Sequence, residues 1–230
     1  MSFRESYLAF RQRLVSLYDA AEAAKYDAWI ASLTVDDHRA SLNDLLPHCP
    51  LRPGMTVLDA GAGTGVLCMM LSLVPGLQLT ALEPCGEMLD RLRSKPEIAG
   101  INVHQGFCDH LTDRSHFPAG TFDVVTSRQL TNTLFDPLAA FENWYFWLRP
   151  GGWVIVMDGL FDRDGWPDPW KDLIDQLPLS ACRTMAMVPY LLEKCGFAIE
   201  YVGLMERTNE MPSTRTKRYM VVARKPQQAG

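Results

Sequence analysis

Residues 57–67, Val57-Leu58-Asp59-Ala60-Gly61-Ala62-Gly63-Thr64-Gly65-Val66-Leu67, decide the fold of this chain. An apolar run ends in Asp59, glycines follow at alternate positions, and the residues after Gly65 suit a helix. Glycines at a strand-to-helix turn let the backbone pass close under a ligand, and the helix N-terminus points at that ligand. Glu83 ends a second strand-like run about twenty residues later, where a carboxylate can bind both hydroxyls of a ribose. Together these features predict a nucleoside pocket.

The spacing of the glycines separates two kinds of nucleoside ligand. The dinucleotide fingerprint is G-x-G-x-x-G, whereas this chain has G-x-G-x-G with Asp59 ahead of it. A carboxylate is unfavourable beside a pyrophosphate but suits a ligand with an ammonium group. The pattern Asp59-x-Gly61-x-Gly63-x-Gly65 resembles the first motif of the class I S-adenosylmethionine (SAM) methyltransferases, and Leu82-Glu83-Pro84 resembles their ribose-binding second motif. The resemblance implies SAM as cofactor and S-adenosylhomocysteine (SAH) as product. A glycine turn used only for packing would not account for both acids.

Composition excludes several other functions. At 230 residues, 47% hydrophobic and 21% charged, the chain has room for one large α/β domain or two small ones. A net charge of -5 without a Lys/Arg block disfavours a nucleic-acid partner, because phosphate binding needs clustered cations. We expect the basic residues near the C-terminus to be solvated strand ends; they are Arg215, Lys217, Arg218, Arg224 and Lys225.

Neither a membrane nor a metal is expected. The first residues lack the apolar run of a signal peptide, and no stretch approaches about 18 uncharged apolar residues, so we expect a cytoplasmic protein. The six cysteines show no C-x-x-C spacing and are expected to be reduced thiols. His104, Cys108, His110 and His116 do not have the spacing of a familiar zinc site.

Periodicity predicts a helical segment followed by an α/β fold. Tyr7, Phe10, Leu14 and Leu17 recur at intervals of three and four, as one buried helix face requires, and residues 2–46 are expected to be helical. Strands and helices then alternate, which predicts a mostly parallel sheet. The expected strands are Thr56–Asp59, Gln78–Glu83, Asn102–Gly106, Phe122–Ser127, Trp153–Asp158, Phe197–Leu204 and Arg218–Arg224. The expected helices are Gly65–Leu73, Gly86–Ser94, Pro137–Leu148 and Pro189–Cys195.

The resemblance covers residues 51–225 and implies the architecture. It implies a seven-stranded, mostly parallel sheet with helices on both faces and an antiparallel last strand. Residues 1–50 would form an N-terminal helical cap over the active site, and residues 51–230 a Rossmann-like domain with a lid insertion at about 160–185. Phe122-Asp123-Val124-Val125, Asp136-Pro137 and Leu148-Arg149-Pro150-Gly151-Gly152 resemble the small-molecule branch of the family. Tyr26-Asp27-Ala28-Trp29 resembles the segment that folds over the cofactor there.

Ligands of open α/β sheets lie beyond the carboxyl ends of the strands. This rule and the resemblance select the expected cofactor contacts, which are Tyr26, Asp59, Gly61, Ala62, Gly63, Gly65, Glu83, Pro84, Met88, Phe107, Cys108, Asp109 and Arg128. Met88 is equally compatible with a core position, and Tyr18 or Tyr26 is expected to reach the cofactor carboxylate or close over it. Where the family has Gly-Asp for the adenine, this chain has Gly106-Phe107-Cys108-Asp109. Either Phe107 lies against the adenine beside a backbone amide near Cys108, or the loop shifts to bring Asp109 in.

Two residues are candidates for the chemistry. Gln129 follows the fourth strand, where many relatives have a His; it cannot act as a base but can orient a substrate, or it caps the turn together with Asn132. Asp158 ends the fifth strand and would anchor a substrate amine, act as general base, or form a turn with Gly159. Trp166 and Trp170 would either roof the acceptor pocket or anchor a helix.

The resemblance implies a methyl transfer to an O, N, C or S atom of a small-molecule acceptor by in-line displacement. Orientation of the two reactants accounts for most of such catalysis, so no sharp catalytic motif is required. The alternatives are a non-catalytic SAM-binding regulator or partner subunit, and an NAD(P)-dependent oxidoreductase. The glycine spacing and the lack of a hydride-transfer residue set disfavour the oxidoreductase. The chain is expected to be a monomer or homodimer.

Overall fold

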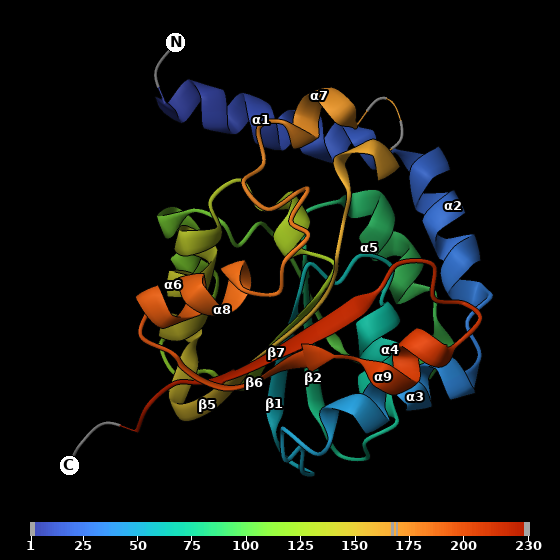
Figure 1. The fold of residues 1–230 in the computed structure, drawn as a ribbon, viewed down its shortest axis with the longest axis vertical. Coiled ribbons are helices and arrows are strands. Elements are labelled where there is room, and N and C mark those ends of the chain that lie inside the picture. The colour runs from blue at the N-terminus through green and yellow to red at the C-terminus, as the bar shows by residue number, and fades with distance from the viewer. Residues whose placement is uncertain (1–2, 167, 169, 228–230) are drawn as a thin grey trace.

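A seven-stranded sheet organises the protein, shown in Figure 1 as a computed structural model. The structure describes residues 3–166, 168 and 170–227. The remaining residues lie outside the described residues; they are Met1 and Ser2 of the expected cap, Pro167 and Pro169 of the expected insertion, and residues 228–230.

The sheet confirms the expected fold class. Its strands are β1 (Thr56–Ala60), β2 (Gln78–Glu83), β3 (Asn102–Gln105), β4 (Phe122–Arg128), β5 (Leu148–Gly159), β6 (Ala198–Leu204) and β7 (Arg218–Arg224). They lie in the order β3-β2-β1-β4-β5-β7-β6. The first five are parallel, and β7 lies antiparallel between β5 and β6. The order reverses between β1 and β4, which is the position at which such sheets bind ligands.

Helices cover both faces of the sheet. They are α1 (Phe3–Leu17), α2 (Ala20–Ala31), α3 (Val35–Leu45), α4 (Val66–Ser72), α5 (Gly86–Arg93), α6 (Pro137–Trp147), α7 (Lys171–Ile174), α8 (Met187–Lys194) and α9 (Glu206–Glu210). In Figure 1, α6 and α8 lie on one side of the sheet and α3, α4 and α5 on the other. Helix α1 and the short α7 lie side by side at one end of the molecule.

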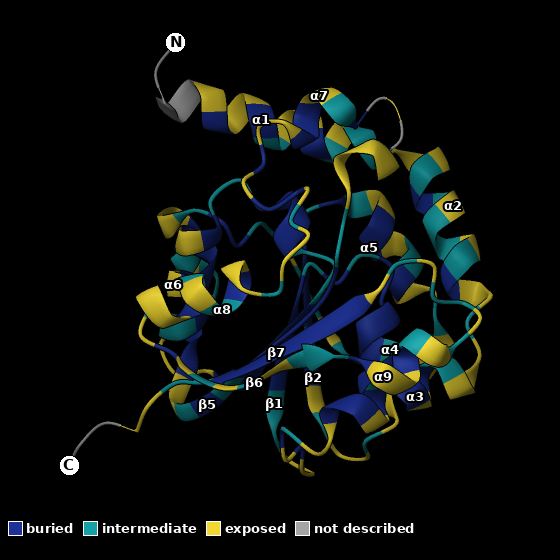
Figure 2. Ribbon diagram, in the orientation of Figure 1, coloured by how far each residue is buried: buried dark blue, intermediate teal, exposed yellow. Residues whose placement is uncertain are grey.

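The inner strands β4 and β7 are buried along almost their whole length because both faces of the sheet are covered, whereas the edge strands β3 and β6 are partly exposed (Figure 2). On the α6 side, Trp144 and Trp147 are fully buried against the strands, as the expected sheet-packed helix requires. On the other side, Leu45 of α3 and Leu67 and Leu71 of α4 fill the core. No helix among the described residues is long and apolar enough to cross a bilayer.

The structure corrects two expectations. Strand β5 begins at Leu148, directly after α6, whereas it was expected to begin at Trp153. Leu148 pairs with Phe122, and the register then shifts so that Trp153 pairs with Val124. The residues between therefore form a bulge within the strand. Arg218 was expected to be solvated, but it is buried at the start of β7 because that strand lies inside the sheet.

The N-terminal helix and the segment after β5 pack against each other. Phe10 and Leu14 of α1 belong to one buried cluster with Trp170 and Leu173 around α7. Arg11 of α1 is held by the carboxylates of Asp109 and Asp113, which follow β3. Two segments far apart in the sequence thus form one layer beyond the carboxyl ends of the strands.

Candidate active site

A cavity of about 630 Å³ lies at the carboxyl edge of the sheet, under α1 and the segment after β5. Almost all of the expected site residues line it, namely Tyr26, Asp59, Gly61, Ala62, Gly63, Glu83, Pro84, Met88, Phe107, Cys108, Asp109, Arg128 and Gln129. Gly65 and Asp158 are not among the lining residues. Its volume is in the range of small-molecule sites, about 300–1,000 Å³.

The glycines after β1 have different roles. All three have positive φ, at 69° for Gly61, 54° for Gly63 and 98° for Gly65. A Cβ on Gly61 or Gly65 would lie 2.6 Å from Leu130 or 2.8 Å from Ile98, so these two glycines permit close packing. A Cβ on Gly63 would meet nothing nearer than Tyr26, at 3.9 Å. Gly63 therefore leaves backbone open to the cavity, and Gly65 serves the packing of α4 instead.

Glu83 lies at the end of β2 with its carboxylate fixed by two amides. Its Oε2 accepts a hydrogen bond from Gly63 N, and its Oε1 accepts one from Cys85 N, each at 2.9 Å. The side chain is buried, and burial raises its pKa to about 7. A carboxylate has about four lone-pair sites, so two remain for the hydroxyls of a ribose.

Asp59 presents a carboxylate oxygen without a partner. Its Oδ2 accepts a hydrogen bond from the Cys68 thiol at 3.2 Å, while Oδ1 is buried and unpaired among the described residues. Burial raises the pKa of Asp59 to about 7. A buried, unpaired carboxylate oxygen is costly, so this position favours a ligand that brings an N–H donor or a positive charge.

Arg128 supplies the opposite charge. Its guanidinium is 5.3 Å from the ring centroid of Trp29, and Nη1 donates to Gln129 Oε1 at 3.4 Å. It makes no ion pair with any described residue, and burial lowers its pKa. Asp59 and Arg128 thus line the same cavity, and the carboxyl group of one does not form an ion pair with the guanidinium of the other. The ammonium and carboxylate of an amino acid fit this arrangement.

Asp109 lines the cavity, but protein donors occupy both of its oxygens. Oδ1 accepts from Arg11 Nη2 at 2.8 Å and Tyr7 OH at 3.1 Å, and Oδ2 accepts from Phe135 N at 2.9 Å. The Arg11 guanidinium also lies 4.2 Å from the ring centroid of Phe107. This arrangement favours adenine contact through Phe107 and a nearby amide, and the contact stays a prediction.

The two candidates for the chemistry differ in location. Gln129 lines the cavity and has a φ of 54°, the single positive value among described non-glycine residues. Such a backbone is strained and occurs preferentially at functional sites. Asp158 is buried, accepts hydrogen bonds from the Thr131 hydroxyl and from Gly159 N at 2.7 Å, and is absent from the lining. Through its bond to Thr131, Asp158 therefore anchors the loop that follows β4.

Several lining residues escaped the sequence interpretation. They come from α1, the segment after β5 and the loop before β7, and include Leu14, Val15, Leu160, Phe161, Asp162, Arg215, Thr216 and Lys217. For the loop before β7, the sequence held one clue, the antiparallel direction expected for the last strand. An antiparallel strand starts at the edge of the sheet where the parallel strands end, so the loop before it reaches the cavity.

Comparison with known proteins identifies relatives along most of the chain. The sequence profile of the family described as "Methyltransferase domain" matches residues 35–201. The chain is 27% identical over 207 residues to the ubiquinone/menaquinone biosynthesis C-methyltransferase UbiE of Shewanella piezotolerans, an alignment covering 87% of this chain and 77% of that protein.

Solved structures agree on the fold. A SAM-dependent methyltransferase from Aquifex aeolicus superimposes with a TM-score of 0.64 at 20% identity, covering 90% of this chain and 99% of that one. Phosphoethanolamine N-methyltransferase 2 of Haemonchus contortus, solved with SAM, gives a TM-score of 0.57 at 19% identity over 81% of this chain and 52% of that one.

Proposed function

Because the chain belongs to the class I SAM-dependent methyltransferases, we propose that it transfers the methyl group of SAM to an O, N, C or S atom of a small-molecule acceptor. The single observation that supports this most is the cavity itself, which brings the carboxylates of Asp59 and Glu83 and the guanidinium of Arg128 around one space. The C-methyltransferase relative makes carbon the first acceptor atom to test.

The residues present fit the cofactor. Glu83 would bind the ribose hydroxyls, Asp59 the ammonium and Arg128 the carboxylate of the amino acid portion. Bound SAM supplies an activated methyl group. The chain's own contribution is to orient two reactants and to exclude water, which in well-aligned systems removes on the order of 7–11 kcal/mol from a barrier.

Gln129 would orient the acceptor from the loop after β4. The backbone N–H of Gln129 donates to Met157 O at 2.9 Å, and this bond holds the strained backbone in place. Gln129 lines the cavity together with Asn132 and Thr133. Amide and hydroxyl groups can position a nucleophile by hydrogen bonding but do not take its proton at neutral pH. Asp158 would act on this loop through Thr131 and not on the acceptor.

Calorimetric titration with SAM, SAH and NADH tests the proposal. We expect binding of the first two and none of NADH, and a loss of SAM affinity of at least about tenfold in both Asp59→Ala and Glu83→Ala. Glu97→Ala, which removes an exposed acid, is the matched control. Unchanged affinity in both site variants would refute the cofactor assignment. SAM binding without SAH formation across an acceptor panel would favour the non-catalytic alternative.

A further inference from the structure

The loop before β7 lies at the acceptor end of the cavity. Arg218, the first residue of β7, pairs with Gly159, the last residue of β5, and Leu160 N donates to Lys217 O at 3.0 Å. The proposed adenosine contacts follow β1, β2 and β3. Residues 215–217 lie beyond β5, on the other side of the point where strand order reverses. They are therefore placed to meet the acceptor and not the adenosine.

The walls at this end are apolar and aromatic. Phe161 and Trp166 have ring centroids 5.9 Å apart, and Trp166 and Trp170 have centroids 5.8 Å apart. The Trp166 indole N–H donates to Ser180 O at 2.9 Å, so its polar atom is satisfied by the protein. The rings join Leu130 and Leu160 in lining the cavity. Such walls suit the flat apolar body of a ring-containing molecule.

The charges at the mouth are unbalanced. Among the lining acids, Asp162, in the segment after β5, is already paired with Arg183 at 3.0 Å, and Glu22 of α2 with Lys25 at 3.3 Å. Arg215 and Lys217 also line the cavity but make no ion pair or side-chain hydrogen bond with any described residue.

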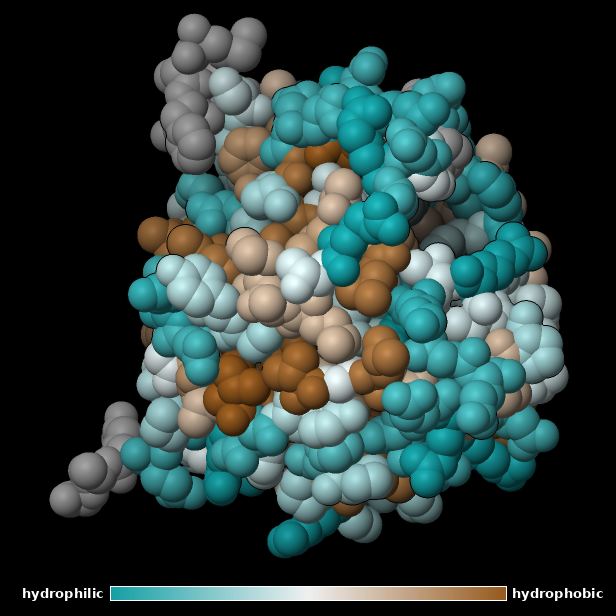
Figure 3. All heavy atoms as spheres, viewed as in Figure 1, coloured by the Kyte–Doolittle hydropathy of each residue, from teal (hydrophilic) through white to brown (hydrophobic). Residues whose placement is uncertain are grey.

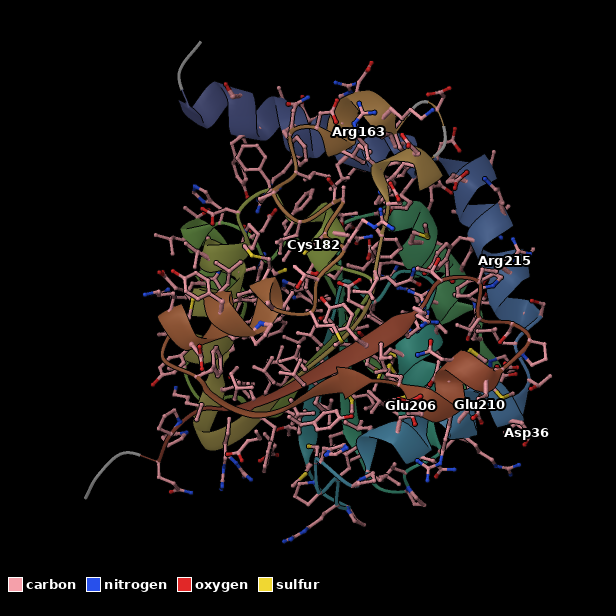
Figure 4. The ribbon with its side chains drawn as sticks, in the orientation of Figure 1. Asp36, Arg163, Cys182, Glu206, Glu210 and Arg215 are labelled. Carbon is pink, nitrogen blue, oxygen red and sulfur yellow. The ribbon has the colours of Figure 1, made fainter. Side chains whose placement is uncertain are left out.

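The view of the surface agrees with this placement. Figure 4 labels Arg215 on the loop between α9 and β7, and in Figure 3 the surface is hollowed beside this loop. Behind Phe161, the buried Arg218 guanidinium lies 6.0 Å from the ring centroid. A protein of net charge -5 thus gathers unpaired cations at one opening. Clefts lined by one sign of charge concentrate ligands of the other sign.

We propose that the methyl acceptor is a ring-containing apolar molecule that carries a carboxylate or phosphate group, and that Arg215 and Lys217 bind this anionic group at the mouth of the cavity. This assignment rests on the proposed methyltransferase function and adds the acceptor class to it. The ring would lie between the leucines and the aromatic residues, near Gln129. The anion would stay at the opening, where two cations meet it without full loss of its hydration, so the interaction weakens with added salt.

A pair of fluorescent probes with nearly the same apolar body tests the assignment without turnover. Anilinonaphthalene sulfonate carries an anion, and phenylnaphthylamine does not. Each is titrated into the protein saturated with SAH. We expect the Arg215→Gln/Lys217→Gln double variant to bind the sulfonate about tenfold more weakly than wild type and the neutral probe equally well. The Arg39→Gln/Arg93→Gln variant, which removes two exposed cations elsewhere, should bind both probes as wild type does.

Competition then identifies the anion. Naphthoate, naphthyl phosphate and the neutral naphthamide are used to displace the bound sulfonate probe. Displacement by naphthoate or naphthyl phosphate but not by naphthamide supports the assignment. The stronger of the two anionic competitors then shows whether the site prefers a carboxylate or a phosphate. Equal displacement by all three, or unchanged sulfonate affinity in the Arg215/Lys217 double variant, would overturn it. SAH affinity is measured separately on wild type and on every variant. Absence of SAH binding by wild type would refute the methyltransferase function, which is a different result from failure of the acceptor assignment.

Discussion

The backbone amide of Gly63 donates a hydrogen bond to the carboxylate of Glu83, with 2.9 Å between N and Oε2. The bond joins the turn after β1 to the end of β2, two neighbouring parallel strands. It orients the carboxylate before any ligand arrives, because Oε1 is held as well by the amide of Cys85. The two sequence motifs are thus one hydrogen-bonded unit, and a ribose meets a preorganised acceptor.

The affinity for SAH should depend on pH. In the ligand-free protein, burial raises the pKa values of Asp59 and Glu83 to about 7, so both become largely protonated as the pH falls from 7.5 to 5.5. A ligand ammonium needs the ionised Asp59, so affinity should fall about tenfold or more over this range. Calorimetry in buffers of matched ionic strength measures the change. An affinity that is flat with pH would contradict the contact.

Asp59→Asn should stabilise the ligand-free protein at pH 8. A carboxyl whose folded pKa is raised contributes stability below its ordinary pKa and loses it as pH rises through about 7. Asparagine does not ionise, so the variant avoids that loss. We expect its free energy of unfolding in urea at pH 8 to be higher than that of wild type by about 1 kcal/mol or more. The difference should shrink as the pH falls and nearly vanish only below about pH 4, where Asp59 is protonated in the unfolded chain as well as in the fold. Equal stability at pH 8 would show that Asp59 is not desolvated.

Arg11→Met should release α1. The guanidinium is the cation for two buried carboxylates, Asp109 and Asp113, and its loss should cost about 3–5 kcal/mol. Urea unfolding measures the cost, and limited proteolysis reports exposure of the N-terminal segment. Arg13→Met is the control, because Arg13 is 45% exposed and its contact with Asp172 is 3.8 Å long. A cost no larger than that of the control would mean that the ion cluster does not hold the helix.

Gln129→Gly should separate backbone strain from side-chain function. A left-handed backbone costs a non-glycine residue about 1–2 kcal/mol, so glycine should raise the free energy of unfolding by about 1 kcal/mol. Gln129→Ala keeps the strain and removes the side chain. Both variants should retain SAM affinity and lose turnover of an identified acceptor to a similar degree. Full activity in the alanine variant would remove Gln129 from the acceptor site.

The strands that sequence reasoning placed well are those with strong local signals. β2 and β7 have the expected bounds, and β1 and β4 extend one residue further, because apolar runs end at turn-forming residues. β5 was placed five residues too late, since its first residue is held by pairing with Phe122, a contact with a distant segment. Local patterns do not contain such pairings.

The same distinction applies to the site. Asp59 and Glu83 stand in motifs whose spacing defines their chemistry, and both line the cavity. Arg215 and Lys217 stand in no motif, and a basic stretch beside a strand ordinarily indicates solvated ends. Their place at the cavity follows from the position of β7 inside the sheet, which depends on β5 and β6 together.

The position of β7 also has a consequence for biosynthesis. In the described sheet β6 pairs with β7 alone, although β6 precedes it in the chain. On the ribosome, β6 therefore emerges before the strand that attaches it to the sheet, and β5 keeps an open edge until residues 218–224 follow. Unpaired strand edges are sites of aggregation. A nascent chain arrested shortly before residue 218 should be the form of this protein that most needs a chaperone.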